Sequence, residues 1–313
     1  MDQEIKKTYQ NIKSIKIQGA TNVAVATGQA LKKYSKKISA GNKKEFVSKI
    51  KKAGQYLTKA RATEPMAENL LEFLLFSLKN FQSSDIGELK KQSQQTIDYI
   101  LNLFEQNNDK IIKAGSGLIK NKNRIFTHCH SSTVIKILKQ AEKDKKNIKV
   151  FQTETRPLYQ GHKTAKDLLR AGIEDTLVVD SAADFLLSRR SGSDFKIDKM
   201  IIGCDAISLD GSCVNKVGSF GLARIAHENK VPVYIATQSL KINEEAKNIK
   251  AIKIEQRPAK EVWAQAPKNL KILNPAFDRV PAEFIQGYIC EFGIVKPKNL
   301  VKKIKAQYPW LWL

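Results

Sequence analysis

From Arg124 onward, short apolar segments alternate with amphipathic stretches, and few folds satisfy this pattern. The apolar segments cover residues 124–128, 148–152, 176–179, 200–203 and 233–236, with a sixth candidate at 252–255. Helical periodicity fills the intervals, as in 132–144 and 182–190. Strands that alternate with helices of roughly 10 to 15 residues form a parallel sheet covered on both faces. We therefore expect a doubly wound, mostly parallel sheet.

The segment before this alternation has a helical pattern instead. Apolar residues recur at three- and four-residue spacing in 20–38 and 64–81, and a longer helix over 92–115 should end near Gly115 and Gly117. The chain is thus predicted to be an α/β protein with two domains. We expect an N-terminal helical domain over 1–118 and a Rossmann-like α/β catalytic domain over 119–313.

The charge balance is strongly basic. The chain has 54 Lys plus Arg against 31 Asp plus Glu, a formal net charge of +23. Such a field attracts polyanions. However, the lysines are spread widely and no aromatic residues interleave with them as a stacking platform would require. We interpret the basicity as a solvated lysine-rich surface and expect no specific nucleic-acid partner.

Composition also bears on the compartment. The four cysteines form no CxxC pair, and no apolar run approaches the roughly 18 to 20 residues that a membrane span needs. The N-terminal segment lacks the apolar core of a secretory signal. These features predict a cytoplasmic protein that does not associate with membranes.

Chemically useful side chains follow several of the predicted strands. Cys129 and Ser131 follow the first, Arg156 the second, Asp205 the fourth, and Lys241 comes soon after the fifth. In an open parallel sheet, ligands bind beyond the carboxyl ends of the strands. A nucleophile, an acid, hydroxyls and cations are therefore expected at one edge.

Cys129 stands where a strand should turn into a helix. Backbone N–H groups and the helix dipole at such a junction favour a thiolate. A small buried residue at the turn is the alternative. The neighbouring His128 and His130 suggest zinc, but consecutive side chains point to different sides and no second ligand cluster follows. We expect no metal.

Asp205 ends a buried strand in the segment IIGCDAI. A carboxyl group in such surroundings can keep its proton and act as a donor, although an Asp that caps the following turn is the alternative. Asn215 and Lys216 precede a glycine that opens a helix, an arrangement that suits a phosphate but also an ordinary helix start with a solvated lysine. The fingerprint GxGxxG is absent after the first strand, which disfavours NAD.

Arg156 precedes Pro157 and should be held extended. As one of few arginines, it is a candidate ligand contact, with a structural salt bridge as the alternative.

Four segments together resemble one known superfamily. They are TETRPLYQGHKTAKDLLRAGI, VDSAADFLL, IIGCDAISLDGSCVNKVGS and NPAFDRVPAEFI. The superfamily unites the alpha, beta and delta subunits of initiation factor 2B, methylthioribose-1-phosphate isomerase and archaeal ribose-1,5-bisphosphate isomerase. The likeness covers nearly the whole chain and is strongest between residues 124 and 295.

The resemblance implies an activity. The isomerases of this superfamily use a Cys and an Asp, which match Cys129 and Asp205, whereas the regulatory subunits generally lack the pair. The segments look nearer to the ribose-1,5-bisphosphate type. This implies aldose–ketose isomerisation of ribose 1,5-bisphosphate to ribulose 1,5-bisphosphate in nucleotide (AMP) salvage. A Cys129 thiolate would act as base on C2, and protonated Asp205 as donor to the carbonyl oxygen. A non-catalytic regulatory protein is the alternative.

The resemblance also implies contacts and partners. Phosphate or sugar contacts carry over to Arg61, Asn215, Lys216, Lys241 and the segment Gln18-Gly19-Ala20-Thr21. In that segment the family pattern is Arg-Gly-Ala-Gly, so Gln18 and Thr21 depart from it and one cation is missing. No cofactor is implied. A homo-oligomer, either a dimer or a trimer of dimers, and AMP as an activator are implied.

Overall fold

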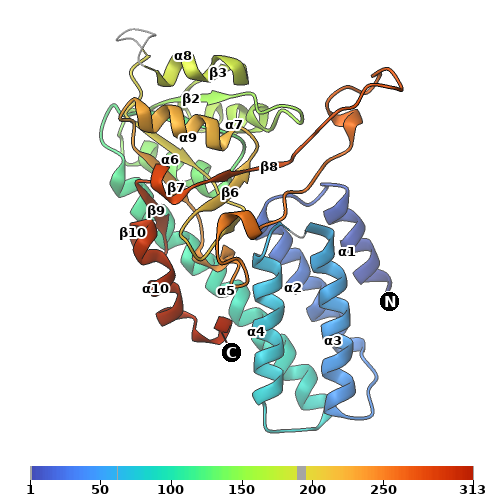
Figure 1. The fold of residues 1–313 in the computed structure, drawn as a ribbon. Coiled ribbons are helices and arrows are strands. Elements are labelled where there is room, and N and C mark those ends of the chain that lie inside the picture. Colours follow the sequence, from blue (N-terminus) through green and yellow to red (C-terminus); the bar gives the residue numbers. More distant parts are fainter. Residues whose placement is uncertain (1, 62, 189–194, 313) are drawn as a thin grey trace. The chain divides into compact units, whose positions relative to one another are not determined.

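The computed structural model describes residues 2–61, 63–188 and 195–312. The chain forms two compact units. The first comprises Met1–Gln106, Leu240–Glu244 and Ile304–Leu313, and the second comprises Asn107–Ser239 and Glu245–Lys303. Figure 1 shows the elements of both along the chain. Among the described residues, no helix is both long and apolar enough to cross a membrane.

The first unit is built from helices, as the apolar spacing predicts. They are α1 (Gln3–Lys13), α2 (Ala20–Lys37), α3 (Lys43–Thr58), α4 (Met66–Asn80) and the first part of α5 (Ile86–Leu118). The long helix starts earlier than its apolar pattern indicates because Asp85 caps it, with Oδ1 accepting from the Glu88 N–H at 2.8 Å. In α3, a Cβ at Gly54 would lie 2.3 Å from Leu71 Cδ1, so glycine permits the close contact between α3 and α4.

The second unit contains the predicted mostly parallel sheet. Its strand order is β10-β9-β7-β4-β1-β2-β3, and only the edge pair β9–β10 is antiparallel. The strands are β1 (Arg124–Thr127), β2 (Lys149–Thr153), β3 (Glu174–Val178), β4 (Lys199–Ile202), β7 (Val233–Ala236), β9 (Gly287–Cys290) and β10 (Gly293–Val295). The predicted fold class is therefore confirmed.

Helices connect and cover these strands. They are α6 (Ser132–Lys143), α7 (Gln160–Leu169), α8 (Ala183–Leu187), α9 (Ser219–Glu228) and α10 (Pro297–Gln307). The end of α5 packs with α6 and α7 in a core around Ile125, Ile137 and Val150 on one face, and α8 and α9 lie together on the other (Figure 1). The predicted helix at 182–190 corresponds to α8, and its last two residues lie outside the described ranges.

The sixth predicted strand, 252–255, is wrong. The sixth strand that runs parallel is β9, which pairs with β7. Ile252 and Ile254 instead pack against a small second sheet, and Arg279 Nη2 donates to Ile252 O at 2.8 Å. Their alternation therefore reflects burial against this small sheet rather than a place in a strand ladder.

The small antiparallel sheet has the order β5-β6-β8. Its strands are β5 (Ala206–Ile207), β6 (Cys213–Lys216) and β8 (Phe277–Val280). The β5–β6 turn contains Asp210 and Gly211: Asp210 Oδ1 accepts from the Ser212 N–H at 3.0 Å, and Gly211 has a φ of 79°. This hairpin begins directly after Asp205, so the small sheet positions the end of β4.

Candidate functional site

Cys129 follows β1 directly, before α6 begins. Its φ of 68° lies in the left-handed region, which costs a residue with a Cβ about 1 to 3 kcal/mol. Two side chains hold this conformation. The Cys129 N–H donates to Thr155 Oγ1 at 3.0 Å, and the Cys129 carbonyl accepts from Thr164 Oγ1 at 3.0 Å.

The environment of Cys129 favours the protonated thiol. Burial raises the pKa of the Cys129 thiol to about 11, and the Asp205 and Asp180 carboxylates add to the rise, while the Lys216 ammonium opposes it. These surroundings favour the thiol, whereas the helix start was expected to favour a thiolate. Loss of hydration is the largest cause of the rise. Because both charges shift the Cys129 pKa, Asp205 and Lys216 lie close enough to affect its ionisation.

Ser131 and Asp205 flank this position. Ser131 caps α6, its Oγ accepting from the Val134 N–H at 3.4 Å. A Cβ at Gly203 would lie 2.9 Å from Ser131 Oγ, so the close approach of Ser131 to the end of β4 requires a glycine there. The Asp205 N–H donates to Val214 O at 2.8 Å, which starts the β5–β6 pairing and sets Asp205 at this strand end.

Asn215 and Lys216 end β6 beside the same edge. Asn215 is buried, and its Nδ2 donates to Ser219 Oγ at 2.9 Å. A Cβ at Gly203 would lie 3.7 Å from Asn215 Oδ1, so the Asn215 side chain also lies close to the end of β4. Lys216 Nζ lies 5.2 Å from the centre of the Phe277 ring, a cation–π distance. These contacts fix a cation near Cys129.

The start of α9 does not offer all its N–H groups to a phosphate. The Gly218 and Phe220 N–H groups donate to Asp278 Oδ2 at 3.2 and 3.1 Å. This carboxylate already caps the helix, so the prediction of a phosphate cradle is wrong at these two donors. Asp278 belongs to the segment NPAFDRVPAEFI, which gives that segment a structural role.

Arg156 lies in the exposed turn after β2. Its N–H donates to Asp180 Oδ2 at 2.7 Å. Its guanidinium donates to Tyr159 Oη and, at 3.0 Å, to Val262 O, and its Cζ lies 4.9 Å from the centre of the Tyr159 ring. These partners are uncharged, so these contacts of the guanidinium join loops rather than form an ion pair.

The predicted segment Gln18–Thr21 belongs to the first unit. Gln18 is exposed, and its carbonyl accepts from Asn22 Nδ2 at 3.0 Å. Gly19 is the N-cap of α2 with a φ of 88°, Ala20 is buried and Thr21 is half-buried. A glycine thus meets the conformational need of this helix start, whereas positions 18 and 21 carry no such constraint.

Arg61 and Lys241 are also in the first unit, and both are buried. Arg61 Nη2 forms an ion pair with Glu64 Oε1 at 2.7 Å. The main chain on both sides of Lys241 is fixed by buried Asn69, whose Nδ2 donates to Leu240 O and Ile242 O, each at 2.8 Å. Asn69 was not among the predicted residues, because an Asn within a helical pattern carries no signal of a distant carbonyl partner.

Within the second unit, the structure gathers several predicted residues at the carboxyl edge of the sheet: Cys129, Ser131, Asp205, Asn215 and Lys216. Thr155, Thr164 and Asp278 join them structurally but were missed from the sequence. Thr155 lies in a loop, Thr164 in α7 and Asp278 in β8, and no local periodicity marks a polar side chain whose partner is distant in the sequence. Within the described ranges, no cluster of three or more His, Cys, Asp or Glu is arranged to hold a metal ion.

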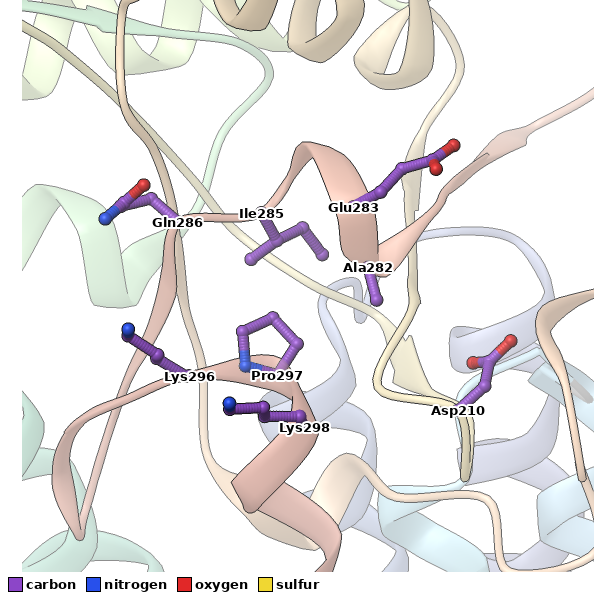
Figure 2. Close-up of a pocket in the computed structure, with 8 residues that line it drawn as sticks. All are labelled: Asp210, Ala282, Glu283, Ile285, Gln286, Lys296, Pro297 and Lys298. Atoms are coloured by element: carbon purple, nitrogen blue, oxygen red, sulfur yellow. The ribbon is translucent and has the colours of Figure 1, made fainter.

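A cavity of about 420 Å³ lies elsewhere in the second unit. Figure 2 shows its lining: Asp210, Ala282, Glu283, Ile285, Gln286, Lys296, Pro297 and Lys298. Pro297 and Lys298 begin α10, Lys296 directly precedes it, and Asp210 comes from the β5–β6 turn. No predicted site residue lines it, so the chemistry at the strand ends does not depend on this cavity.

The fold and the edge cluster define a class. This is an α/β protein whose polar groups converge beyond the carboxyl ends of a parallel sheet, where such proteins bind their ligands. The model of the Initiation factor 2 subunit family matches residues 16–297, and the chain belongs to that family.

Individual relatives extend the comparison. The ribose 1,5-bisphosphate isomerase of Methanocaldococcus jannaschii is 37% identical over 309 residues, covering 98% of this chain and 96% of the relative. The 5-methylthioribose 1-phosphate isomerase of Pyrococcus horikoshii superposes with a TM-score of 0.78 at 27% identity, covering 97% of this chain and 88% of that one. The translation initiation factor eIF-2B of the same organism gives a TM-score of 0.81 at 24% identity, covering 95% and 98%, which supports the fold alone.

Proposed function

We propose that this chain is a sugar-phosphate isomerase, and that its substrate is ribose 1,5-bisphosphate, converted to ribulose 1,5-bisphosphate. One observation carries the proposal: at the strand ends, the Asp205 carboxylate and the Lys216 ammonium both act on the Cys129 thiol. The 37% identity to a ribose 1,5-bisphosphate isomerase along nearly the whole of both chains supports the substrate.

The reaction needs one acid and one base. In the furanose form, C1 carries both the ring oxygen and a phosphate. The bond from C1 to the ring oxygen breaks, and that oxygen takes up a proton. Hydrogen leaves C2 and arrives at C1, and the C2 hydroxyl loses its proton as the carbonyl forms. The substrate thus gains one proton from an acid and gives one to a base.

We assign the acid to Cys129 and the base to Asp205. With a pKa of about 11, the Cys129 thiol carries its proton near neutral pH and can deliver it to the ring oxygen. The Asp205 carboxylate is then the group able to receive a proton. This order reverses the roles expected from the resemblance, and it follows from burial of the sulfur. Hydrogen moves from C2 to C1 either as a hydride or as a proton by way of an enol phosphate, in which case the group that removes the C2 proton returns it to C1.

Lys216 is the phosphate-binding cation of this proposal. It lies near Cys129, and its position over Phe277 leaves the ammonium charge able to attract an anion. The contacts expected at Gln18–Thr21, Arg61 and Lys241 remain predictions. At Arg61 the ion pair with Glu64 already offsets the guanidinium charge, so we expect a weaker contribution from it.

Methylthioribose 1-phosphate is the second candidate substrate. It carries one phosphate, and Gln18 stands where the family pattern has an arginine. One cation fewer favours a substrate with less negative charge. The 27% identity to a 5-methylthioribose 1-phosphate isomerase is consistent with this choice.

The experiment compares both substrates with purified protein, with and without AMP, following the ketose by NMR. Turnover of ribose 1,5-bisphosphate at the higher kcat/KM supports the first assignment. Cys129→Ser and Asp205→Asn should each lower kcat by about 10² or more, with thermal melting to show that the fold persists. If the wild type turns over neither sugar, the proposal falls, and a non-catalytic regulatory role takes its place.

A further inference from the structure

We propose that Thr155 and Thr164 form a clamp on the main chain of Cys129, and that this clamp sets the exposure and reactivity of the Cys129 thiol. The inference rests on the proposed function only for the role of Cys129 in turnover. The clamp itself follows from two hydrogen bonds and the backbone conformation of Cys129. It makes Thr155 and Thr164 positioning residues, because they act through Cys129.

The clamp closes on both polar groups of one residue. The Cys129 N–H donates to Thr155 Oγ1 and its carbonyl accepts from Thr164 Oγ1, each at 3.0 Å. Both threonines are buried, with 0% and 1% of their surface exposed. Because the Cys129 φ of 68° is unfavourable for a residue with a Cβ, the two bonds hold the chain where it would not otherwise stay.

The Thr164 half is fixed by a chain of donors that begins at the surface. Lys163 Nζ donates to His130 Nε2 at 3.0 Å and to Asp167 Oδ2 at 2.8 Å. Since Nε2 accepts, the His130 proton lies on Nδ1 and points to Thr164 Oγ1 at 3.1 Å. Burial and Lys163 lower the His130 pKa to about 4, which keeps the ring neutral. The Thr164 hydroxyl must then donate to the Cys129 carbonyl.

The Thr155 half is fixed by a carboxylate. Asp180 Oδ1 accepts from the Thr155 N–H at 2.9 Å, and Asp180 Oδ2 accepts from the Arg156 N–H at 2.7 Å. The Thr155 hydroxyl lies 3.2 Å from Thr153 Oγ1 and 3.4 Å from Thr153 O, so its hydrogen has a partner and its lone pairs face Cys129. Thr155 follows β2, Asp180 follows β3 and Thr164 lies in α7. The backbone conformation of Cys129 therefore depends on all three elements.

A released Cys129 should relax to a common backbone conformation and move its sulfur toward water. The pKa of the thiol would then fall from about 11 toward its ordinary value of 9.0. The thiolate fraction would rise about 100-fold at pH 8, and the lower nucleophilicity of a weaker base would offset about half of that on a logarithmic scale. Alkylation should therefore become about tenfold faster.

The test measures alkylation of Cys129 by iodoacetamide at pH 8, read by mass spectrometry of the labelled peptide. The other cysteines, Cys204, Cys213 and Cys290, are buried. Thr155→Val and Thr164→Val keep the shape of each side chain and remove its hydroxyl, so alkylation should speed up about tenfold. Thr155→Ser and Thr164→Ser restore the hydroxyl and should return the wild-type rate.

A matched control is Thr27→Val. Thr27 is equally buried, in α2, and its Oγ1 has no hydrogen-bond partner among the described residues. This variant should leave both alkylation and turnover unchanged. In turnover, the two clamp valine variants should lower kcat with little change in KM, and the serine variants should recover it.

Lys163→Gln covers the case in which the valine variants fail to fold, because its side chain is 55% exposed. It removes the charged donor that fixes the His130 tautomer, so alkylation should rise in the same direction by a smaller factor. Wild-type alkylation rates in the folded valine variants, or in Lys163→Gln if those do not fold, would overturn the clamp. If the valine variants are alkylated faster but the wild type converts neither sugar, the clamp is supported and the proposed function is contradicted.

Discussion

The protonation state of Cys129 gives the sharpest prediction about the chemistry. Burial places the pKa of its thiol at about 11, against an ordinary value of 9.0. At pH 8 the thiolate fraction is then about 10⁻³, compared with about 10⁻¹ for an unperturbed thiol of that ordinary value. The alkylation rate of the wild type should therefore rise about tenfold for each pH unit from 7 to 10, without a plateau.

The same pH series in turnover separates the two possible roles. If Cys129 acts as the acid, kcat/KM stays level between pH 7 and 10 and declines only as the thiol ionises near pH 11. If a thiolate is the base, kcat/KM rises with unit slope over that range. Lys216→Met should slow alkylation further, because the ammonium opposes the rise in the Cys129 pKa. An alkylation plateau by pH 9 in the wild type would refute the reasoning from burial.

Three further predictions follow from single contacts. Asp278→Ala removes the acceptor shared by two N–H groups of α9 and should lower the free energy of unfolding by about 1 to 2 kcal/mol in urea, whereas Asp278→Asn, which still accepts, should lose less; equal losses would contradict the capping role. Gln18→Arg should lower KM for ribose 1,5-bisphosphate by up to about tenfold if one charge-assisted bond of roughly 1.5 kcal/mol forms; an unchanged KM would place position 18 away from the phosphate. The His130 pKa is lowered from 6.5 to about 4, so the neutral ring stabilises the fold above pH 6.5 and this stability is lost as pH falls toward 4. His130→Asn should flatten the decline of the urea midpoint between pH 7 and 4.5, and an unaltered decline would mean that other groups cause it.

Much of the fold is readable from the chain because apolar periodicity is local. The run 233–236 is β7 with the same bounds, the segment 124–128 is one residue longer than β1, and the segment 200–203 is shifted by one residue from β4. The run 252–255 has the same apolar alternation, yet it pairs with no strand of the large sheet. Periodicity reports which side chains are buried, and it does not say which neighbour buries them.

The edge residues were predictable by type and place because strand ends in a parallel sheet meet at one side. Cys129 and Asp205 are positions that the order of elements dictates. The protonation state of Cys129, in contrast, does not follow from its place in the sequence. The sequence suggested a thiolate, whereas the tertiary structure favours a thiol, because desolvation depends on every segment that packs around the sulfur.

The sequence by itself determined the order of helices and strands and the residue types that reach the carboxyl edge. The tertiary structure decided which hydrogen bonds those residues make. Thr164 reaches the Cys129 carbonyl across 35 positions, and Asp278 caps a helix 60 residues before it. No local pattern encodes such contacts, because they exist only after the strands have paired and brought distant loops within 3 Å or so of each other.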